Sequence, residues 1–263
     1  MPNKEVYTHG FYDDQAMASY RSAERVLQHM LSLFPSLQSV IDIGCGTGSW
    51  LSAAQNLGIE KIYGMEGSPA AKDMLMIPDD NWHAVDVTKP FNCGQWFDLA
   101  MSLEVAEHLP FEKHGVFIEN ITQHSDLVLF SAAIPYQGGT GHHTENWPSY
   151  WAQLFSSKGF RCYDLLRHRI WNQRGINFWY KQNLLVFIRE GAEEKFNMEI
   201  ESSVESPISI IHPELYLWAI NRAGGITNAE YNRDLAYYLR VKDLDPNVLI
   251  EEITYGDKYN NEF

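Results

Sequence analysis

The stretch LQSVIDIGCGTGSWL, residues 37–51, decides the fold, because an apolar strand runs into three closely spaced glycines and then into a helix. Its first part is mostly apolar, as expected for a parallel strand that helices cover on both faces. Gly44, Gly46 and Gly48 permit positive φ angles and a close approach of the backbone to a ligand. The stretch therefore predicts a loop that presents free backbone N–H groups to a nucleotide cofactor.

The spacing of these glycines distinguishes two classes of cofactor. A dinucleotide-binding loop has the form GxGxxG and would need its third glycine at position 49, where this sequence has Ser49. A nicotinamide dehydrogenase is therefore the weaker alternative. Counted from Asp42 the pattern is DxGxGxG, and with this motif the chain resembles the class I S-adenosylmethionine-dependent methyltransferases. The resemblance implies S-adenosylmethionine as the cofactor.

The order of elements along residues 36–190 is similar to that of the same family. After the strand at 37–43, apolar runs predict strands at 62–65, 82–87, 96–102, 126–132, 161–167 and 178–189. The predicted fold class is α/β. We expect a Rossmann-like, doubly wound sheet of seven strands, mostly parallel, with strand 7 antiparallel as the resemblance implies.

Three regions are expected along the chain. Apolar positions at helical spacing over 13–34 predict a helix, so that residues 1–35 would form an N-terminal lid. Residues 36–190 would form the methyltransferase domain. Residues 191–263 would form a C-terminal extension or linker, with a short helix after Pro213.

Composition excludes some classes of function. Lys and Arg number 20 against 34 Asp and Glu, and the net charge of −14 would repel the phosphates of a nucleic acid. Three cysteines without metal-like spacing are typical of reduced thiols. No run is apolar enough to cross a bilayer, and the first residues resemble no signal peptide. We expect a soluble cytoplasmic protein that acts on a small molecule.

Acidic residues follow successive strands, at the edge where open α/β sheets bind ligands. The resemblance implies that Gly44 and Gly46 hold the methionine end of the cofactor and that Glu66 accepts hydrogen bonds from the ribose. It also implies that Asp86 accepts from the adenine amino group and that the backbone of Val87 reaches the ring. The other residues expected at this cofactor site are Asp42, Cys45, Gly67 and Leu103.

The loop GGTGHH, residues 138–143, follows the fifth predicted strand and carries two histidines. His142 or His143 is a candidate general base, because the pKa of imidazole lies near neutrality, and Glu104 is a further candidate catalytic group. Methyltransferases acting on small molecules and sugars resemble the chain here. Candidate acceptor-binding residues are Tyr12, Tyr136, Glu145, Asn146, Trp147, Tyr150 and Arg174.

The phrase SLEVAEHLP, residues 102–110, permits a second mechanism. In a helix starting at Glu104, positions i, i+3 and i+4 would share a face, so Glu104, Glu107 and His108 could bind Mg²⁺ or Mn²⁺. With His143 as a fourth ligand, this ExxEH segment resembles the metal-dependent small-RNA 2′-O-methyltransferases, and its first part resembles quinone-biosynthesis O-methyltransferases. The metal would lower the pKa of an acceptor hydroxyl.

These observations predict an S-adenosylmethionine-dependent O-methyltransferase. Its acceptor would be a sugar, a nucleotide-linked sugar, or another cell-envelope or natural-product intermediate, with a histidine activating the hydroxyl. The alternatives are the metal-dependent O-methyltransferase and a non-catalytic module that keeps the methyltransferase fold. The joint presence of Gly44, Glu66 and Asp86 disfavours the non-catalytic module.

Overall fold

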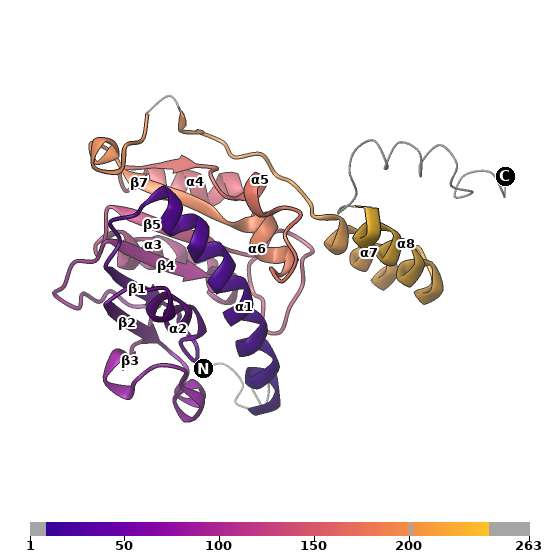
Figure 1. The fold of residues 1–263 in the computed structure, drawn as a ribbon, viewed down its shortest axis with the longest axis horizontal. Coiled ribbons are helices and arrows are strands. Elements are labelled where there is room, and N and C mark those ends of the chain that lie inside the picture. Colours follow the sequence, from indigo (N-terminus) through magenta and orange to yellow (C-terminus); the bar gives the residue numbers. More distant parts are fainter. Residues whose placement is uncertain (1–8, 200–201, 242–263) are drawn as a thin grey trace. The chain divides into compact units, whose positions relative to one another are not determined.

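The computed structural model describes residues 9–199 and 202–241. Its centre is a seven-stranded sheet with the order β3-β2-β1-β4-β5-β7-β6 (Figure 1). The strands are β1 (Ser39–Ile43), β2 (Lys61–Glu66), β3 (Trp82–Ala84), β4 (Leu99–Leu103), β5 (Leu127–Ser131), β6 (Phe160–Tyr163) and β7 (Leu185–Arg189). β7 pairs antiparallel with β5 and β6, and the other pairings are parallel. The predicted fold class is therefore confirmed.

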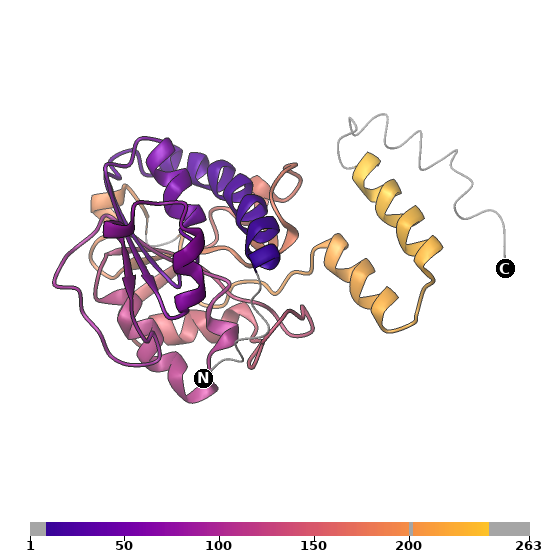
Figure 2. The ribbon, with the colours of Figure 1, turned by 90° about the horizontal axis from the view of Figure 1, so that it is seen from below.

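Helices cover both faces of this sheet (Figure 2). One face carries α1 (His9–Leu33), α2 (Ser49–Asn56), α5 (Arg167–Ile170) and α6 (Phe178–Asn183), and the other carries α3 (His114–Thr122) and α4 (Pro148–Ser156). Successive strand residues enter separate cores: Val40 packs with the first group of helices and Ile41 with the second. Since neither face meets water, the strands are continuous apolar runs.

The parallel strands bring their carboxyl ends to one edge of the sheet. From β1 the chain moves outward through β2 and β3, and then returns to the other side of β1 to form β4. The loops after β1 and β4 therefore diverge, and such a reversal in strand order leaves a crevice for ligands in open α/β sheets. The functional residues expected from the sequence follow these strands.

Two predicted strands are partly helical. The run 178–189 contains α6 up to Asn183, and β7 begins only at Leu185. The run 161–167 is a strand only as far as Tyr163, and Arg167 already begins α5. Both errors have one cause: apolar runs of this length do not distinguish a buried strand from a short buried helix.

The first compact unit ends at Ile210, and a second begins at Ile211. The second contains α7 (Pro213–Arg222), where the sequence predicts a helix, and α8 (Asn228–Val241), which the sequence did not predict. Within the first unit, the backbone N–H of Val204 donates to the carbonyl of Cys162 at the edge strand β6. Among the described helices, none combines the length and the apolar character that a membrane span requires.

Candidate functional site

The glycine loop after β1 is tied to the neighbouring strand β2. The backbone N–H groups of Gly44 and Cys45 both donate to the carbonyl of Met65, at 2.7 and 3.1 Å. Gly44, Gly46 and Gly48 have φ angles of 85°, 53° and 82°. This left-handed backbone is strained for residues with a side chain, which explains the glycines at these positions.

Close packing and open space alternate along this loop. A Cβ atom at Gly44 would lie 2.6 Å from Val105, and one at Gly48 would lie 2.8 Å from Ile77. A Cβ at Gly46 would meet nothing within 4 Å. The loop is therefore packed against protein at its two ends and open in the middle, where the backbone can approach a ligand closely.

Glu66, at the end of β2, faces the same loop. Its carboxylate accepts hydrogen bonds from the backbone N–H groups of Gly46 and Ser68, both at 2.7 Å, and Gly67 contributes a further N–H. Burial raises the pKa of Glu66, against the opposing effect of these donors. The arrangement leaves a carboxylate at the sheet edge that can accept from a diol.

Asp42 and Cys45 lie beside Glu66 and are buried. Burial, and then the negative charge of Glu66, raise the pKa of Asp42 from 3.8 to about 8. Burial and the same two carboxylates raise the pKa of the Cys45 thiol well above its usual range, so this cysteine is not a reactive thiolate. Asp42 therefore keeps its proton at neutral pH, and a cationic ligand bound beside it would favour its ionised form.

Asp86 and Val87 follow β3 at the same edge. Asp86 accepts from the hydroxyl of Thr88 at 2.5 Å and pairs with Lys89 at 3.0 Å; these hydrogen bonds lower its pKa to about 2. Its side chain remains 48% exposed, whereas Val87 is buried. Leu103 ends β4 and is also buried. The expected cofactor residues thus come from the carboxyl ends of β1, β2, β3 and β4.

The chain turns sharply after β4, and no helix starts at Glu104. Glu104 has a φ of 55°, which is unusual for a residue other than glycine. A short 3₁₀-helix, Ala106–His108, follows, and α3 begins only at His114. This turn, rather than a helical face, brings the side chains of Glu104 and Glu107 together at the sheet edge.

Of these two carboxyl groups, that of Glu107 is fully buried and that of Glu104 is half-buried. Glu107 is 0% exposed, and neither of its carboxylate oxygens has a hydrogen-bond partner in the described part of the chain. Burial, and then the charge of Glu104, raise the pKa of Glu107 well above its usual range, and burial also raises the pKa of Glu104. A buried carboxylate without donors is costly, so Glu107 requires a proton or a nearby cation.

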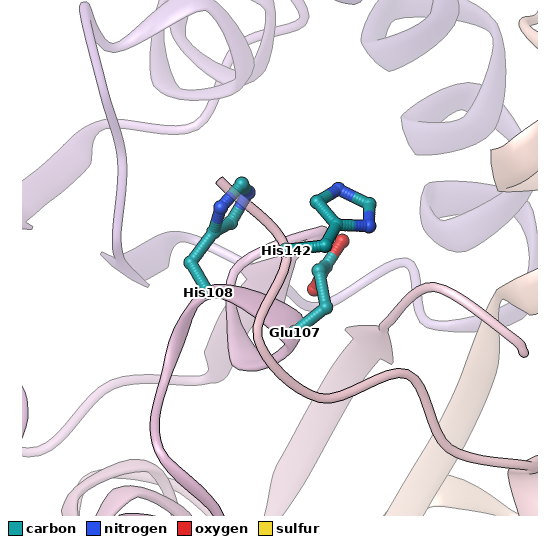
Figure 3. Close-up of side chains that lie close together, drawn as sticks. All are labelled: Glu107, His108 and His142. Atoms are coloured by element: carbon teal, nitrogen blue, oxygen red, sulfur yellow. The ribbon is translucent and has the colours of Figure 1, made fainter. Parts of the chain in front are cut away.

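The loop after β5 lies over this turn. The backbone N–H groups of His143 and Thr144 donate to the carbonyl of Glu107, at 2.8 and 3.0 Å. Potential ligand atoms of Glu107, His108 and His142 all lie within 4.8 Å of one another (Figure 3). The structure therefore groups His142 with the acidic turn, whereas the His143 side chain is exposed and is not part of this group.

Hydrogen bonds orient both clustered histidines. His142 Nδ1 lies 2.9 Å from Glu145 Oε1, and His108 Nδ1 lies 3.2 Å from the carbonyl of Gly141. Because a carbonyl only accepts, His108 carries its proton on Nδ1 and keeps a lone pair on Nε2. Burial, and then the nearby His142, lower the pKa of His108 to about 4, so His108 is neutral at pH 7.

An amide network surrounds Glu104, and sequence reasoning missed it. Gln137 and Asn183 donate to the two Glu104 oxygens at 2.8 and 3.1 Å, and Asn183 and Gln182 also donate to Gln137 Oε1. Gln182 and Asn183 end α6, inside the run expected to be one strand. Their signal was the polar triplet KQN within FWYKQNLLVF, since a strand buried on both faces rarely carries three polar residues in succession.

The expected acceptor residues have diverse environments. Tyr136 is 85% exposed with a φ of 69°, and Trp147 is 38% exposed. The Tyr150 hydroxyl lies 2.9 Å from His114 Nδ1, so it links α4 to α3. Asn146 donates its backbone N–H to Ala133.

Two other expected acceptor residues lie elsewhere. Arg174 lies exposed between α5 and α6. Tyr12 lies in the first turns of α1, and its side chain is outside the described part of the structure.

Comparisons with known proteins extend this description. Residues 15–168 match a family model described as a methyltransferase domain. No curated protein sequence matches the chain. Among solved structures, DesVI of Streptomyces venezuelae is similar with a TM-score of 0.55 and 17% identity, over 70% of this chain and 97% of that chain.

Two further solved structures have the same fold. An S-adenosylmethionine-bound amino pentose methyltransferase from Micromonospora echinaspora has a TM-score of 0.53 and 15% identity, over 71% of this chain and 99% of that chain. A sugar N-methyltransferase from a Streptoalloteichus species has a TM-score of 0.54 and 15% identity, over 72% and 98%. At these identities the likeness establishes the fold.

Proposed function

Because the chain belongs to the class I S-adenosylmethionine-dependent methyltransferase family, we propose that it methylates a hydroxyl group of a small polar acceptor such as a sugar. The observation that carries this proposal is the position of His142, which Glu145 holds beside the buried carboxyl group of Glu107. This histidine lies on the loop after β5, at the same sheet edge as the glycine loop.

The glycine loop and Glu66 suit the cofactor. Bound S-adenosylmethionine supplies a methyl group on a positively charged sulfur, which makes that methyl electrophilic. The open backbone at Gly46 would hold the methionine end, Glu66 would accept from the ribose hydroxyls, and Asp86 would accept from the adenine. A cationic ligand would favour the ionised forms of Asp42 and Glu66, because a nearby positive charge lowers the pKa of a carboxyl group.

His142 would activate the acceptor. A neutral imidazole with its Nδ1 proton directed at Glu145 has a lone pair on Nε2, which can take the proton of the acceptor hydroxyl as the oxygen gains the methyl group. The Glu145 carboxylate would then stabilise the imidazolium. Nearby, the exposed rings of Tyr136 and Trp147 offer apolar faces for an acceptor ring.

A sugar-like acceptor is supported by two independent observations. Two structural neighbours are described as an amino pentose methyltransferase and a sugar N-methyltransferase. The net charge of −14 disfavours nucleic-acid acceptors, because their phosphates would be repelled. A hydroxyl acceptor requires a base, and the histidine cluster provides one.

The first experiment is calorimetric titration of the protein with S-adenosylmethionine and S-adenosylhomocysteine. We expect saturable binding at one site, and absence of binding to both would refute the proposal in favour of the non-catalytic module. Turnover of S-adenosylmethionine is then measured with a panel of nucleotide-linked sugars. With an accepted sugar, His142→Gln should lower turnover by about 100-fold or more, the range of a lost general base.

The adjacent histidine supplies a matched control. His143→Gln makes the same chemical change one residue away, at an exposed side chain outside the cluster. We expect it to retain most of the turnover, and both variants to bind S-adenosylmethionine as the wild type does. Equal losses in the two variants would contradict the role of His142.

A second candidate function is methyl transfer assisted by a divalent metal ion. The observation that favours it is Glu107, whose buried carboxylate oxygens lack donors in the described residues. Glu104, Glu107, His108 and His142 would hold the ion. Bound Mg²⁺ or Mn²⁺ would lower the pKa of an acceptor hydroxyl and orient it. Carboxylate ligands suit Mg²⁺ and Mn²⁺.

Metal binding can be measured without the acceptor. Titration with Mn²⁺, followed by the electron paramagnetic resonance of the free ion, should reveal one site that Glu107→Gln abolishes. Glu112→Gln removes an exposed acid from the following turn and is the matched control. A chelator should then abolish turnover, and added Mg²⁺ or Mn²⁺ should restore it. Turnover that is unaffected by chelator would leave His142 acting as a base without metal.

A further inference from the structure

The loop between β5 and α4 folds around a single carboxylate. Glu145 accepts hydrogen bonds from the backbone N–H groups of Tyr136 and Gly138, both at 2.7 Å, and its Oε1 lies 2.9 Å from His142 Nδ1. The side chains of Glu145 and His142 are only 18% and 14% exposed. Water therefore competes weakly for these hydrogen bonds.

These contacts determine which nitrogen of His142 carries the proton. Two backbone donors already point at the Glu145 oxygens, so the carboxylate acts as an acceptor in this loop. The imidazole must then donate through Nδ1, which leaves Nε2 unprotonated in the neutral ring. The opposite tautomer would place a lone pair against a carboxylate oxygen.

Close packing of the His142 ring against Gly139 restricts the ring from another side. A Cβ atom at Gly139 would lie 2.2 Å from His142 Nε2, so only glycine leaves room for the ring in this position. Glu145 also holds Tyr136 in a left-handed conformation with a φ of 69°. Strain of this kind persists only where the surrounding structure imposes it.

We propose that Glu145 is a positioning residue, which fixes His142 in the tautomer protonated on Nδ1 and so keeps Nε2 free as the base or ligand. Its catalytic consequence rests on the proposed function, whereas its effect on the tautomer does not. The same carboxylate orders the backbone of the loop that presents Tyr136. Glu145 thus acts through His142 rather than on the acceptor.

Glutamine at position 145 cannot replace the carboxylate. Its side chain has one acceptor oxygen, but three donors converge on Glu145. If the amide NH₂ group faced His142, it would donate to Nδ1 and shift the proton to Nε2. If it faced Tyr136, two N–H groups would oppose each other. Either orientation weakens the control over His142.

The tautomer can be measured directly by nitrogen NMR of protein labelled with ¹⁵N-histidine at neutral pH. The signals of His142 are identified by their loss in His142→Gln. In the wild type we expect a protonated-type Nδ1 and an unprotonated-type Nε2. In Glu145→Gln we expect both resonances to shift toward the opposite tautomer, whereas Glu119→Gln, which changes an exposed acid on α3, should leave them unchanged.

Two results would overturn the proposal: a wild-type His142 protonated on Nε2, or an unchanged tautomer in Glu145→Gln. If that variant does not fold, Glu145→Ala removes the carboxylate acceptor altogether, and an unchanged tautomer there is equally contradictory. Titration with S-adenosylmethionine of the same samples separates the two proposals. If the wild type does not bind S-adenosylmethionine, the proposed function is refuted, but the tautomer measured for His142 still stands.

Discussion

Replacing Asp42 by asparagine tests the electrostatics of the cofactor loop. Asp42 is 3% exposed, and burial first and Glu66 second raise its pKa from 3.8 to about 8. A raised pKa means that the folded protein holds this proton more tightly than the unfolded chain. The contribution of Asp42 to stability is therefore full below the unfolded-state pKa and is lost as pH rises through about 8.

The size of this loss of stability follows from the pH range that separates the unfolded-state and folded-state pKa values of Asp42. Between about pH 5 and pH 8 the folded protein retains the proton that the unfolded chain has lost, and each pH unit removes about 1.4 kcal/mol of unfolding free energy. Three such units amount to about 4 kcal/mol. Asparagine has nearly the same shape as aspartate but does not titrate, so the unfolding free energy of Asp42→Asn lacks this pH-dependent contribution.

Urea unfolding followed by tryptophan fluorescence, repeated from pH 5 to pH 9, measures the effect. We expect the wild type to lose about 4 kcal/mol more than Asp42→Asn across this range. The exposed Asp80→Asn should follow the wild type. Parallel profiles for the wild type and Asp42→Asn would refute the assignment of a buried, protonated Asp42.

Three further outcomes are expected. Glu66→Gln should weaken S-adenosylmethionine binding by about 10-fold or more in calorimetry, because it loses charge-assisted hydrogen bonds to the ribose, and unchanged affinity would argue against the ribose role. Gly48 has a φ of 82°, and a Cβ there would lie 2.8 Å from a neighbouring side chain, so Gly48→Ala should lower the free energy of unfolding in urea by about 2–3 kcal/mol. Gly58 has a φ of 95° but open space around it, so Gly58→Ala should lower it by only about 1 kcal/mol. Equal losses would contradict the packing argument. Asn183→Ala leaves a buried Glu104 oxygen without its donor and should cost about 2 kcal/mol by the same method, so a neutral effect would contradict the network.

The sheet edge that carries the expected cofactor residues was predictable. The glycine spacing of DxGxGxG and the acidic residues after successive strands placed Gly44, Glu66 and Asp86 at one sheet edge, and in the structure these residues follow or end β1, β2 and β3. These signals are local: each residue sits at the end of an apolar run, and a parallel sheet brings all such ends together. The family match confirms the predicted methyltransferase family.

The cluster of Glu107, His108 and His142 beside that edge was predictable only in part. The sequence left His142 and His143 as equal candidates, and it took Glu145 for an acceptor residue. In the structure the backbones of His143 and Thr144 donate to the Glu107 carbonyl, and the side chain of His142, not that of His143, belongs to the cluster with Glu107 and His108. Such contacts between distant loops leave no periodic signal in the sequence.

The sequence by itself determined the fold class, the family and the sheet edge at which the expected cofactor residues lie, because these depend on strand periodicity and glycine spacing within short stretches. Only the tertiary structure decided which side chains meet beside that edge. Asn183 reaches Glu104 across 79 positions in sequence, and it does so because the run before β7 begins as a helix. The tautomer of His142 likewise depends on how its loop folds around Glu145, since the acceptor for Nδ1–H exists only once that loop has closed.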